Sequence, residues 1–293
     1  MLRRQKIVLH LISCAPKPLD PLSFVKLVFL LRQETAIRHD AAFYDFVPYE
    51  HGPFSFSLYQ ELRALRQHGY LSSEETKVIL APATRALTDT VVQQVPSSTR
   101  VAVEQILSQY GQMGSNSLFQ YVCRTYPWFV WNSTRHARVL ACIERPLPAT
   151  PAVYTTGYAG TSIDAFMANM LRRGLGALVD VRANPISRKY GFSHSSLSRI
   201  SRSLGLVYLS FPSLGIPSSE RRGLISRAAY AHVFGHYQRV TIPAHQDEIQ
   251  SLAAFMKDTA TTLVCYEEDA QYCHRGYLAP ELANFNGLDV VHL

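Results

Sequence analysis

The spacing of hydrophobic positions divides the chain into a mainly helical first part and an alternating second part. Before residue 145, apolar residues recur at helical intervals over 4–13, 22–35, 99–109 and 115–125. After residue 151, short apolar runs alternate with amphipathic stretches. They predict strands at 153–156, 177–181, 207–211, 262–267 and 289–293, and helices at 162–173, 194–204, 245–258 and from about 275. This alternation predicts an α/β domain with a mostly parallel, Rossmann-like sheet.

A proline-rich segment separates the two parts. Residues 145–151 read RPLPATP, with three prolines in seven residues. Such a segment suits an extended linker better than a helix or a central strand. We therefore expect a mainly helical domain over 1–144 and an α/β domain over 152–293.

Within the first domain, an amphipathic helix follows a break in the chain. Residues 43–49 look extended, and His51 to Ser55 are expected to break the chain, with Ser55 as the cap of a helix that ends near Gly69. Two short runs after this helix, 70–71 and 77–80, are expected to form the strands of a wing.

This order of elements is typical of a winged helix-turn-helix. Arg63 and Arg66 lie on the polar face of the helix and would contact nucleic-acid phosphates or bases. The alternative is a solvated helix face in a protein–protein module. Both alternatives stay open at this point.

In the second domain, candidate binding residues follow the first two strands. Gly157 and Tyr158 precede a helix N-terminus, which favours an anion, although a tight structural turn explains the glycines equally well. Asp180 and Arg182 end the second strand, where an arginine can hold a phosphate or carboxylate in a bidentate manner. The alternative is a buried pair that holds the loop.

The segment that continues from Arg182 carries further polar and basic groups. Ser187 and Lys189 lie five and seven residues beyond it. We expect both to take part in substrate or phosphate binding.

The fourth strand leads into the sharpest chemical signal. Cys273, His274 and Arg275 begin a helix, a place where a thiol pKa is lowered and the thiolate becomes a nucleophile. Glu267, at the strand end, is the candidate general acid or base, while Cys265 is expected in the core. Alternatively, Cys273 only packs, and His274 and Arg275 bind an anion without covalent chemistry.

Composition adds a basic partner surface to this picture. Of the 293 residues, 47% are hydrophobic and 17% are charged, which excludes wholesale disorder, and the net charge is +7. A single stretch, 182–227, holds eight basic residues against Glu220: Arg182, Arg188, Lys189, Arg199, Arg202, Arg221, Arg222 and Arg227. Interleaved aromatic residues suit nucleic acid, DNA in preference to RNA. A basic surface without a partner is the alternative.

The cysteines and apolar runs set the expected environment. Five widely spaced cysteines, an odd number, favour a reducing cytoplasm, and no apolar run reaches the length of a membrane span. The first residues fit a helix of a folded domain better than a secretion signal. Because no CxxC or HxxxH pair occurs, we expect no zinc site, and we expect no cofactor.

Four segments of the second domain together resemble the family known as domain of unknown function 488. They are TTGYAGTSIDAF (155–166), LVDVRANPISRKYGFSHSSL (178–197), GLVYLSFPSLG (205–215) and CYEEDAQYCHRGYLA (265–279). Tyr158 departs from the family, whose members usually carry histidine there. The resemblance implies the α/β fold, a pocket at the strand ends, and an association with DNA modification and prokaryotic defence, without a settled reaction.

The first domain has a resemblance of its own. YDFVPYEHGPFS within 43–71 and YPWF at 126–129 resemble the winged-helix domain of Panacea-type antitoxin-like proteins. That resemblance implies either DNA binding or neutralisation of a protein partner.

Three functions follow from these observations. The first is a nucleic-acid-directed enzyme that hydrolyses or excises a base at Glu267, Cys273 and His274. The second is a DNA-binding regulator whose second domain senses an anion or an oxidant. The third is an antitoxin-like module that binds protein, and a homodimer is compatible with each.

Overall fold

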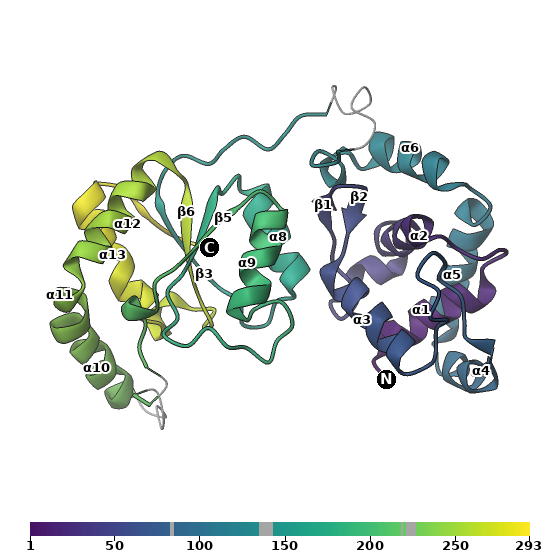
Figure 1. The fold of residues 1–293 in the computed structure, drawn as a ribbon, viewed down its shortest axis with the longest axis horizontal. Coiled ribbons are helices and arrows are strands. Elements are labelled where there is room, and N and C mark those ends of the chain that lie inside the picture. The colour runs from purple at the N-terminus through teal and green to yellow at the C-terminus, as the bar shows by residue number, and fades with distance from the viewer. Residues whose placement is uncertain (83–84, 135–142, 218, 221–226) are drawn as a thin grey trace. The chain divides into compact units, whose positions relative to one another are not determined.

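The computed structural model consists of two compact units, Met1–Arg145 and Pro146–Leu293. It describes the chain except for residues 83–84, 135–142, 218 and 221–226. Each unit has its own hydrophobic core, and Figure 1 labels the helices and strands of both. Among the described residues, no helix combines the length and the hydropathy that crossing a membrane requires.

The first unit is mainly helical, as predicted. Its helices are α1 (Arg3–Cys14), α2 (Pro21–Glu34), α3 (Phe56–Gln67), α4 (Arg85–Gln93), α5 (Ser97–Tyr110) and α6 (Ser115–Thr125). Helices α1 and α2 pack against α5, and α2 also packs against α6. Their apolar faces build the core of the unit. Helix α4 was not predicted from the sequence.

The segment expected to break the chain before α3 forms a hairpin instead. Strands β1 (Val47–Tyr49) and β2 (Gly52–Phe54) pair in antiparallel register. Gly52 adopts a positive φ of 96° where β2 begins, a conformation that glycine tolerates without strain. The predicted cap is confirmed, because the hydroxyl of Ser55 accepts a hydrogen bond of 3.2 Å from the backbone N–H of Leu58.

The two wing strands expected after α3 are reduced to single bridges. Leu71 pairs with Leu80, and Val78 pairs with Leu19. The backbone bonds around them, such as the 3.0 Å bond from Ser72 N to Ile79 O, do not extend into strands. A winged helix is therefore not confirmed, and it stays a prediction.

The second unit is built on a parallel sheet of five strands: β3 (Val153–Gly157), β4 (Ala177–Asp180), β5 (Val207–Ser210), β6 (Thr261–Cys265) and β7 (Val290–His292). Their spatial order is β5-β4-β6-β3-β7, and every pairing is parallel. The α/β prediction is confirmed. Counted from the first strand, the order is 3-2-4-1-5, so the fourth strand is inserted between the first and second, unlike the Rossmann order 3-2-1-4-5-6.

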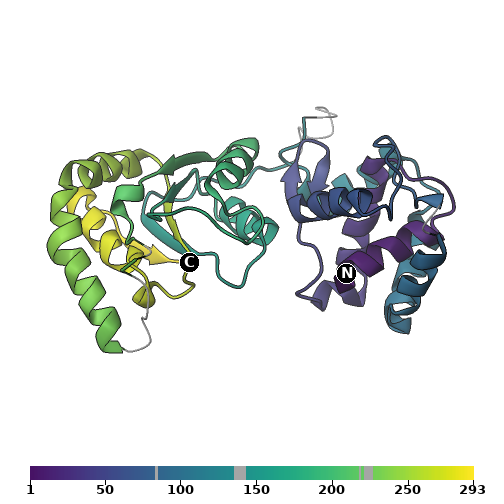
Figure 2. The ribbon, with the colours of Figure 1, turned by 60° about the horizontal axis from the view of Figure 1, so that its bottom comes forward.

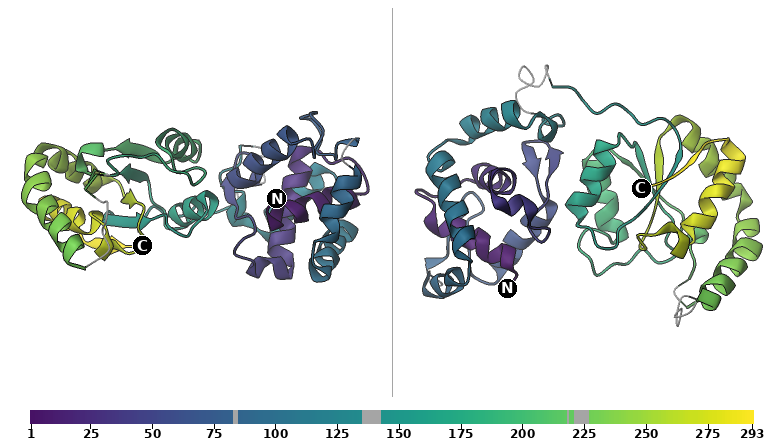
Figure 3. Two further views of the ribbon diagram at one scale, coloured as in Figure 1. Left: turned by 90° about the horizontal axis from the view of Figure 1, so that it is seen from below. Right: turned by 180° about the vertical axis from the view of Figure 1, so that it is seen from behind.

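Helices cover both faces of this sheet. Helices α8 (Ile163–Arg172) and α9 (His194–Ser203) lie on one face, and α12 (Gln246–Asp258) and α13 (Arg275–Asn286) lie on the other. The views in Figures 2 and 3 show the same two layers. Helices α10 (Arg227–His236) and α11 (Ile242–Ala244) add an outer part to the α12–α13 layer. Neither was predicted.

The alternation of side chains along the strands decides which layer each strand end faces. Val179 and Leu263 pack in the core formed with α12 and α13. Cys265 lies two residues beyond Leu263 and shares its face, whereas Asp180 lies next to Val179 and faces α8 and α9. Gly157 is in register with Cys265 at the same edge of the sheet.

Gly157 is required at this edge by a close backbone approach. A Cβ atom built on it would lie 1.8 Å from the carbonyl oxygen of Glu267. The loop that follows β6 therefore passes directly over this glycine. The contact accounts for the glycine without any bound ligand.

We predict that Gly157→Ala destabilises the second unit by about 3 kcal/mol or more, because a backbone atom has to move to admit the methyl group. Gly160→Ala is the control. It has a φ of 74° but nothing within 4 Å of the added Cβ, so it should cost only about 1–2 kcal/mol. Urea unfolding followed by circular dichroism measures both. Tryptophan fluorescence serves as an internal reference, since Trp128 and Trp131 belong to the first unit. Equal midpoints for the two variants would contradict the close approach.

Candidate functional site

The first cluster at the carboxyl edge is centred on a buried ion pair. Arg182 donates from Nε to Oδ1 of Asp180 at 2.7 Å and from one terminal nitrogen to Oδ2 at 2.6 Å. Further donations reach the hydroxyl of Tyr158 at 2.6 Å and the carbonyl of Phe192 at 2.8 Å. Asp180 and Arg182 are 0% and 3% exposed. Four of the five guanidinium N–H groups therefore have protein partners.

Electrostatics favour the charged form of Arg182. Burial by itself would lower the pKa of Arg182, but its hydrogen bonds to Asp180 and the charge of that carboxylate more than offset burial and raise the pKa. Burial and the same carboxylate raise the pKa of Tyr208, whose hydroxyl donates to Asp180 at 2.8 Å. The tyrosine hydroxyl also lies 3.1 Å from Nδ1 of His194 on α9.

Aromatic stacking completes the first cluster. The rings of Tyr158 and Phe192 are parallel with centroids 4.2 Å apart. The ammonium of Lys189 donates to the backbone oxygen of Tyr158 at 3.1 Å, and the hydroxyl of Ser187 accepts from the backbone of Lys189. The cluster ties the loop after β4 to the first turn after β3. This agrees with the alternative reading of Asp180 and Arg182 as a pair that holds the loop.

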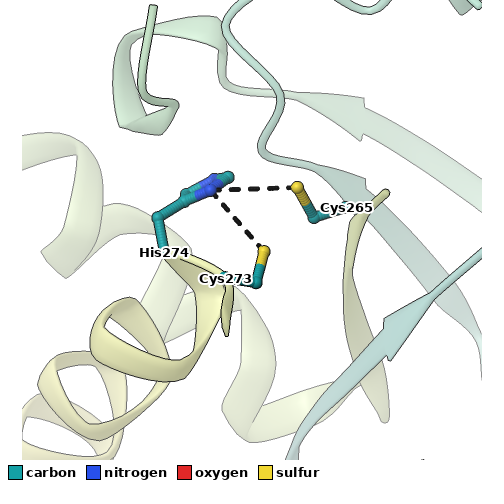
Figure 4. A group of neighbouring side chains, drawn as sticks. All are labelled: Cys265, Cys273 and His274. Carbon is teal, nitrogen blue, oxygen red and sulfur yellow. Dashed lines mark hydrogen bonds between the residues drawn. The ribbon is translucent and has the colours of Figure 1, made fainter. Parts of the chain in front are cut away.

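The second cluster lies on the opposite face of the sheet and joins two thiols to one imidazole (Figure 4). Nδ1 of His274 lies 3.8 Å from Sγ of Cys265 and 3.7 Å from Sγ of Cys273. Nε2 of His274 lies 2.8 Å from the carbonyl oxygen of Val181. The three side chains are 1–3% exposed.

The thiol of Cys273 is more acidic than an ordinary cysteine thiol. Its pKa is held well below its usual value, because a hydrogen bond with Cys265 and the neighbouring His274 and Arg275 outweigh the opposing effect of burial. By contrast, burial raises the pKa of Cys123, in the first unit, to about 11. The thiol at the start of α13 therefore differs chemically from the buried thiol of Cys123.

The side chain of Arg275 binds backbone carbonyl groups and does not face an open site. It is 1% exposed, and its terminal nitrogens donate to the carbonyl oxygens of Glu267 at 2.5 Å and Glu268 at 2.6 Å. This clamp keeps the loop after β6 in place over Gly157. The side chain of Glu267 is half-buried.

The predicted site residues thus divide into two groups that do not share a cleft. Tyr158, Asp180 and Arg182 meet on the α8–α9 side, and Cys273 and His274 meet on the α13 side. A cavity of about 770 Å³ at this edge is lined by residues of α10, the 268–272 loop, the first turn of α13 and the end of the chain, and its described lining includes none of these five residues. Arg221 and Arg222 lie outside the described residues.

Two contributions were missed by reasoning from sequence. Tyr208 and His194 complete the first cluster from β5 and α9, and no local pattern marks them. Cys265 was expected in the core, where it lies, but it also reaches His274. Seven residues separate the two cysteines, unlike the two of a CxxC motif, so a metal-ligand grouping was not expected there.

Over residues 162–210, acidic side chains are buried and most basic side chains lie at the surface. Over residues 162–210, both carboxylates, Asp164 and Asp180, are fully buried. The basic side chains at the surface of that segment are Arg172, Arg173, Arg188, Arg199 and Arg202, all exposed, and Lys189, half-buried. The prediction that Arg199 and Arg202 face solvent is confirmed. In the first unit, Arg63 is exposed and Arg66 half-buried.

Residues 162–282 match the model of one protein family. Its description is Domain of unknown function DUF488. The resemblance predicted for the second domain is confirmed over this range. The DUF488 match spans α8 to α13 and includes both clusters except Tyr158. It does not reach the first unit, whose resemblance to Panacea-type winged-helix domains stays a prediction. Comparisons with curated proteins and with solved structures gave no match.

We predict that Arg182→Met destabilises the second unit by about 3–5 kcal/mol, because it leaves the buried Asp180 carboxylate without its cation. Arg202→Met removes the same group from an exposed position and should change stability by less than about 0.5 kcal/mol. Urea unfolding followed by circular dichroism compares the two. If both variants unfold like the wild-type chain, the pair does not hold the loop.

Proposed function

We propose that this protein binds nucleic acid and that the exposed surface of α8, α9 and the 183–193 loop is its contact surface. The observation that carries this proposal is the sorting of charge over 162–210. Six basic side chains reach the surface of that segment, while both of its carboxylates are buried. Phosphate groups supply the complementary charge at regular intervals.

The chemistry of this surface favours double-stranded DNA. Arg199 and Arg202 are three residues apart on α9 and share one exposed face. Within 162–210, Tyr190 is the one exposed residue among Phe, Tyr and Trp, so the surface offers many cations and little area for base stacking. Such a surface contacts phosphates more than bases. We include Arg63 on α3 as a proposed second contact, from the first unit.

A second candidate function is supported by the acidic thiol of Cys273. A thiolate at the N-terminus of a helix, next to a histidine, is an arrangement that supports nucleophilic catalysis. In this candidate, Glu267 acts as general acid or base in processing a base of the bound DNA. Because Cys273 is 3% exposed, such catalysis requires the 266–272 loop to move aside.

We predict that the double variant Arg199→Gln, Arg202→Gln weakens DNA binding by a similar factor for every sequence tested. Each lost phosphate contact should lower the slope of log K against log salt by about 0.9, so the double variant should lower it by about 1.8. Fluorescence anisotropy of a labelled duplex over a salt series measures both quantities.

The matched control carries the same charge change on the other layer. Arg239 and Lys257 are exposed and lie outside the 162–210 segment, so Arg239→Gln, Lys257→Gln should leave the slope unchanged. Equal losses in the two double variants would show that only net charge matters. No binding by the wild-type chain would reject the proposal altogether.

For the second candidate, we predict that Cys273→Ala and Glu267→Gln each lower the rate of base release from modified or unmodified DNA by about 100-fold or more. Cys123→Ala, which removes a buried thiol from the first unit, should leave the rate unchanged. Chromatography of released bases gives the rates. Wild-type rates in both site variants would exclude this candidate while leaving DNA binding untouched.

A further inference from the structure

The thiol cluster surrounds a common point with three ligand atoms. Sγ of Cys265, Sγ of Cys273 and a ring nitrogen of His274 all lie within 4.8 Å of one another. Figure 4 shows the two sulfur atoms directed toward the imidazole. We propose that these three residues bind one Zn(II) ion. This inference does not depend on the proposed DNA binding.

The distances fit a tetrahedral ion. With Zn–S bonds of about 2.3 Å and a Zn–N bond of about 2.0–2.1 Å, a sulfur and a nitrogen on the same ion lie roughly 3.6 Å apart. The observed separations from Nδ1 are 3.8 Å to Cys265 and 3.7 Å to Cys273. Both sulfur–nitrogen separations therefore already suit a shared ion.

The second nitrogen of the imidazole sets the correct tautomer. A peptide carbonyl can only accept a hydrogen bond, so the 2.8 Å contact between Nε2 and Val181 requires Nε2 to carry a proton. In the neutral ring, Nδ1 then directs its lone pair at the two sulfurs. Metal-binding histidines are usually oriented in this way, with the free N–H donated to a carbonyl or a carboxylate.

The chemical character of the ligands selects the ion. Two thiolates and one imidazole are soft to borderline donors, which suit Zn(II) and do not suit Mg²⁺ or Ca²⁺. Binding transfers the two thiol protons to solvent, and the start of α13 together with Arg275 favours the resulting negative charge. Three protein ligands leave one tetrahedral position for water or another small ligand.

The site would join the end of β6 to the start of α13. Cys265 ends β6, and Cys273 and His274 immediately precede α13. An ion bound here would fasten the loop after β6 at both of its ends. It would also occupy the sulfur of Cys273, so zinc binding and nucleophilic attack by that thiol exclude each other.

The test uses the full chain without an affinity tag, reduced, stripped with a chelator and dialysed against zinc. Mass spectrometry of the metal content should give one zinc per chain. Replacement by Co(II) should produce an intense thiolate-to-cobalt charge-transfer band. Zinc should also raise the melting temperature seen by circular dichroism, and chelator should reverse the rise.

Ligand variants locate the ion. Cys265→Ser, Cys273→Ser and His274→Gln should each lose the bound zinc, while Cys123→Ser and His194→Gln should keep it. Because a ligand variant can also fail to fold, each is checked by circular dichroism, and the wild-type measurements stand without them. A reduced wild-type chain that keeps no zinc, or a cobalt complex without the thiolate band, would overturn the proposal. The proposal would also be overturned if Cys265 and Cys273 form a disulfide and the chain still binds no zinc after that disulfide is reduced.

Discussion

A buried guanidinium fixes the chain where the central strand β6 ends. Arg275 donates to the carbonyl oxygens of Glu267 and Glu268, and the absence of a side chain at Gly157 leaves room for those carbonyls. The loop that contains these carbonyls runs from Cys265, at the end of β6, to Cys273, just before α13. Because both ends of this loop are held, the two thiols and the imidazole of His274 keep a fixed separation. The chemistry of the α13 side depends on this contact.

The arginines of the second unit fall into a buried set and an exposed set. Arg182 and Arg275 are buried and act as hydrogen-bond donors within the protein, so they contribute little to binding at the surface. The arginines of α8 and α9 are exposed, while Asp164 and Asp180 on the same segment are buried. The net charge of the whole chain is only +7. The positive charge is concentrated on the surface of α8 and α9, because the acidic residues of that segment are buried. Position in the fold, more than the number of charges, makes it a candidate contact surface.

Strand register explains why one expected pocket became two clusters. The carboxyl ends of β3, β4 and β6 do meet at one edge, as parallel pairing requires. Successive side chains along a strand, however, point to opposite faces. Asp180 is in register with Val264 and faces α8 and α9, whereas Cys265, one residue further along β6, faces α13. The sheet itself lies between the Asp180–Arg182 pair and the thiol cluster. Each cluster thus has its own chemistry, one ionic and one suited to a soft metal.

The sequence by itself determined the α/β class, the strands of the second unit, most of the helices and the residues worth attention. These features are local: they are the periodicity over about ten residues, the Ser55 cap and the strand-end motifs. Local patterns can be recognised from the sequence without a structure. Only the tertiary structure decided the strand order, the burial of Arg182 and Arg275, and the meeting of Cys265 with Cys273 and His274. Those features depend on contacts between distant segments, such as His274 with Val181. Their free energies come from packing and desolvation, which a local pattern does not contain.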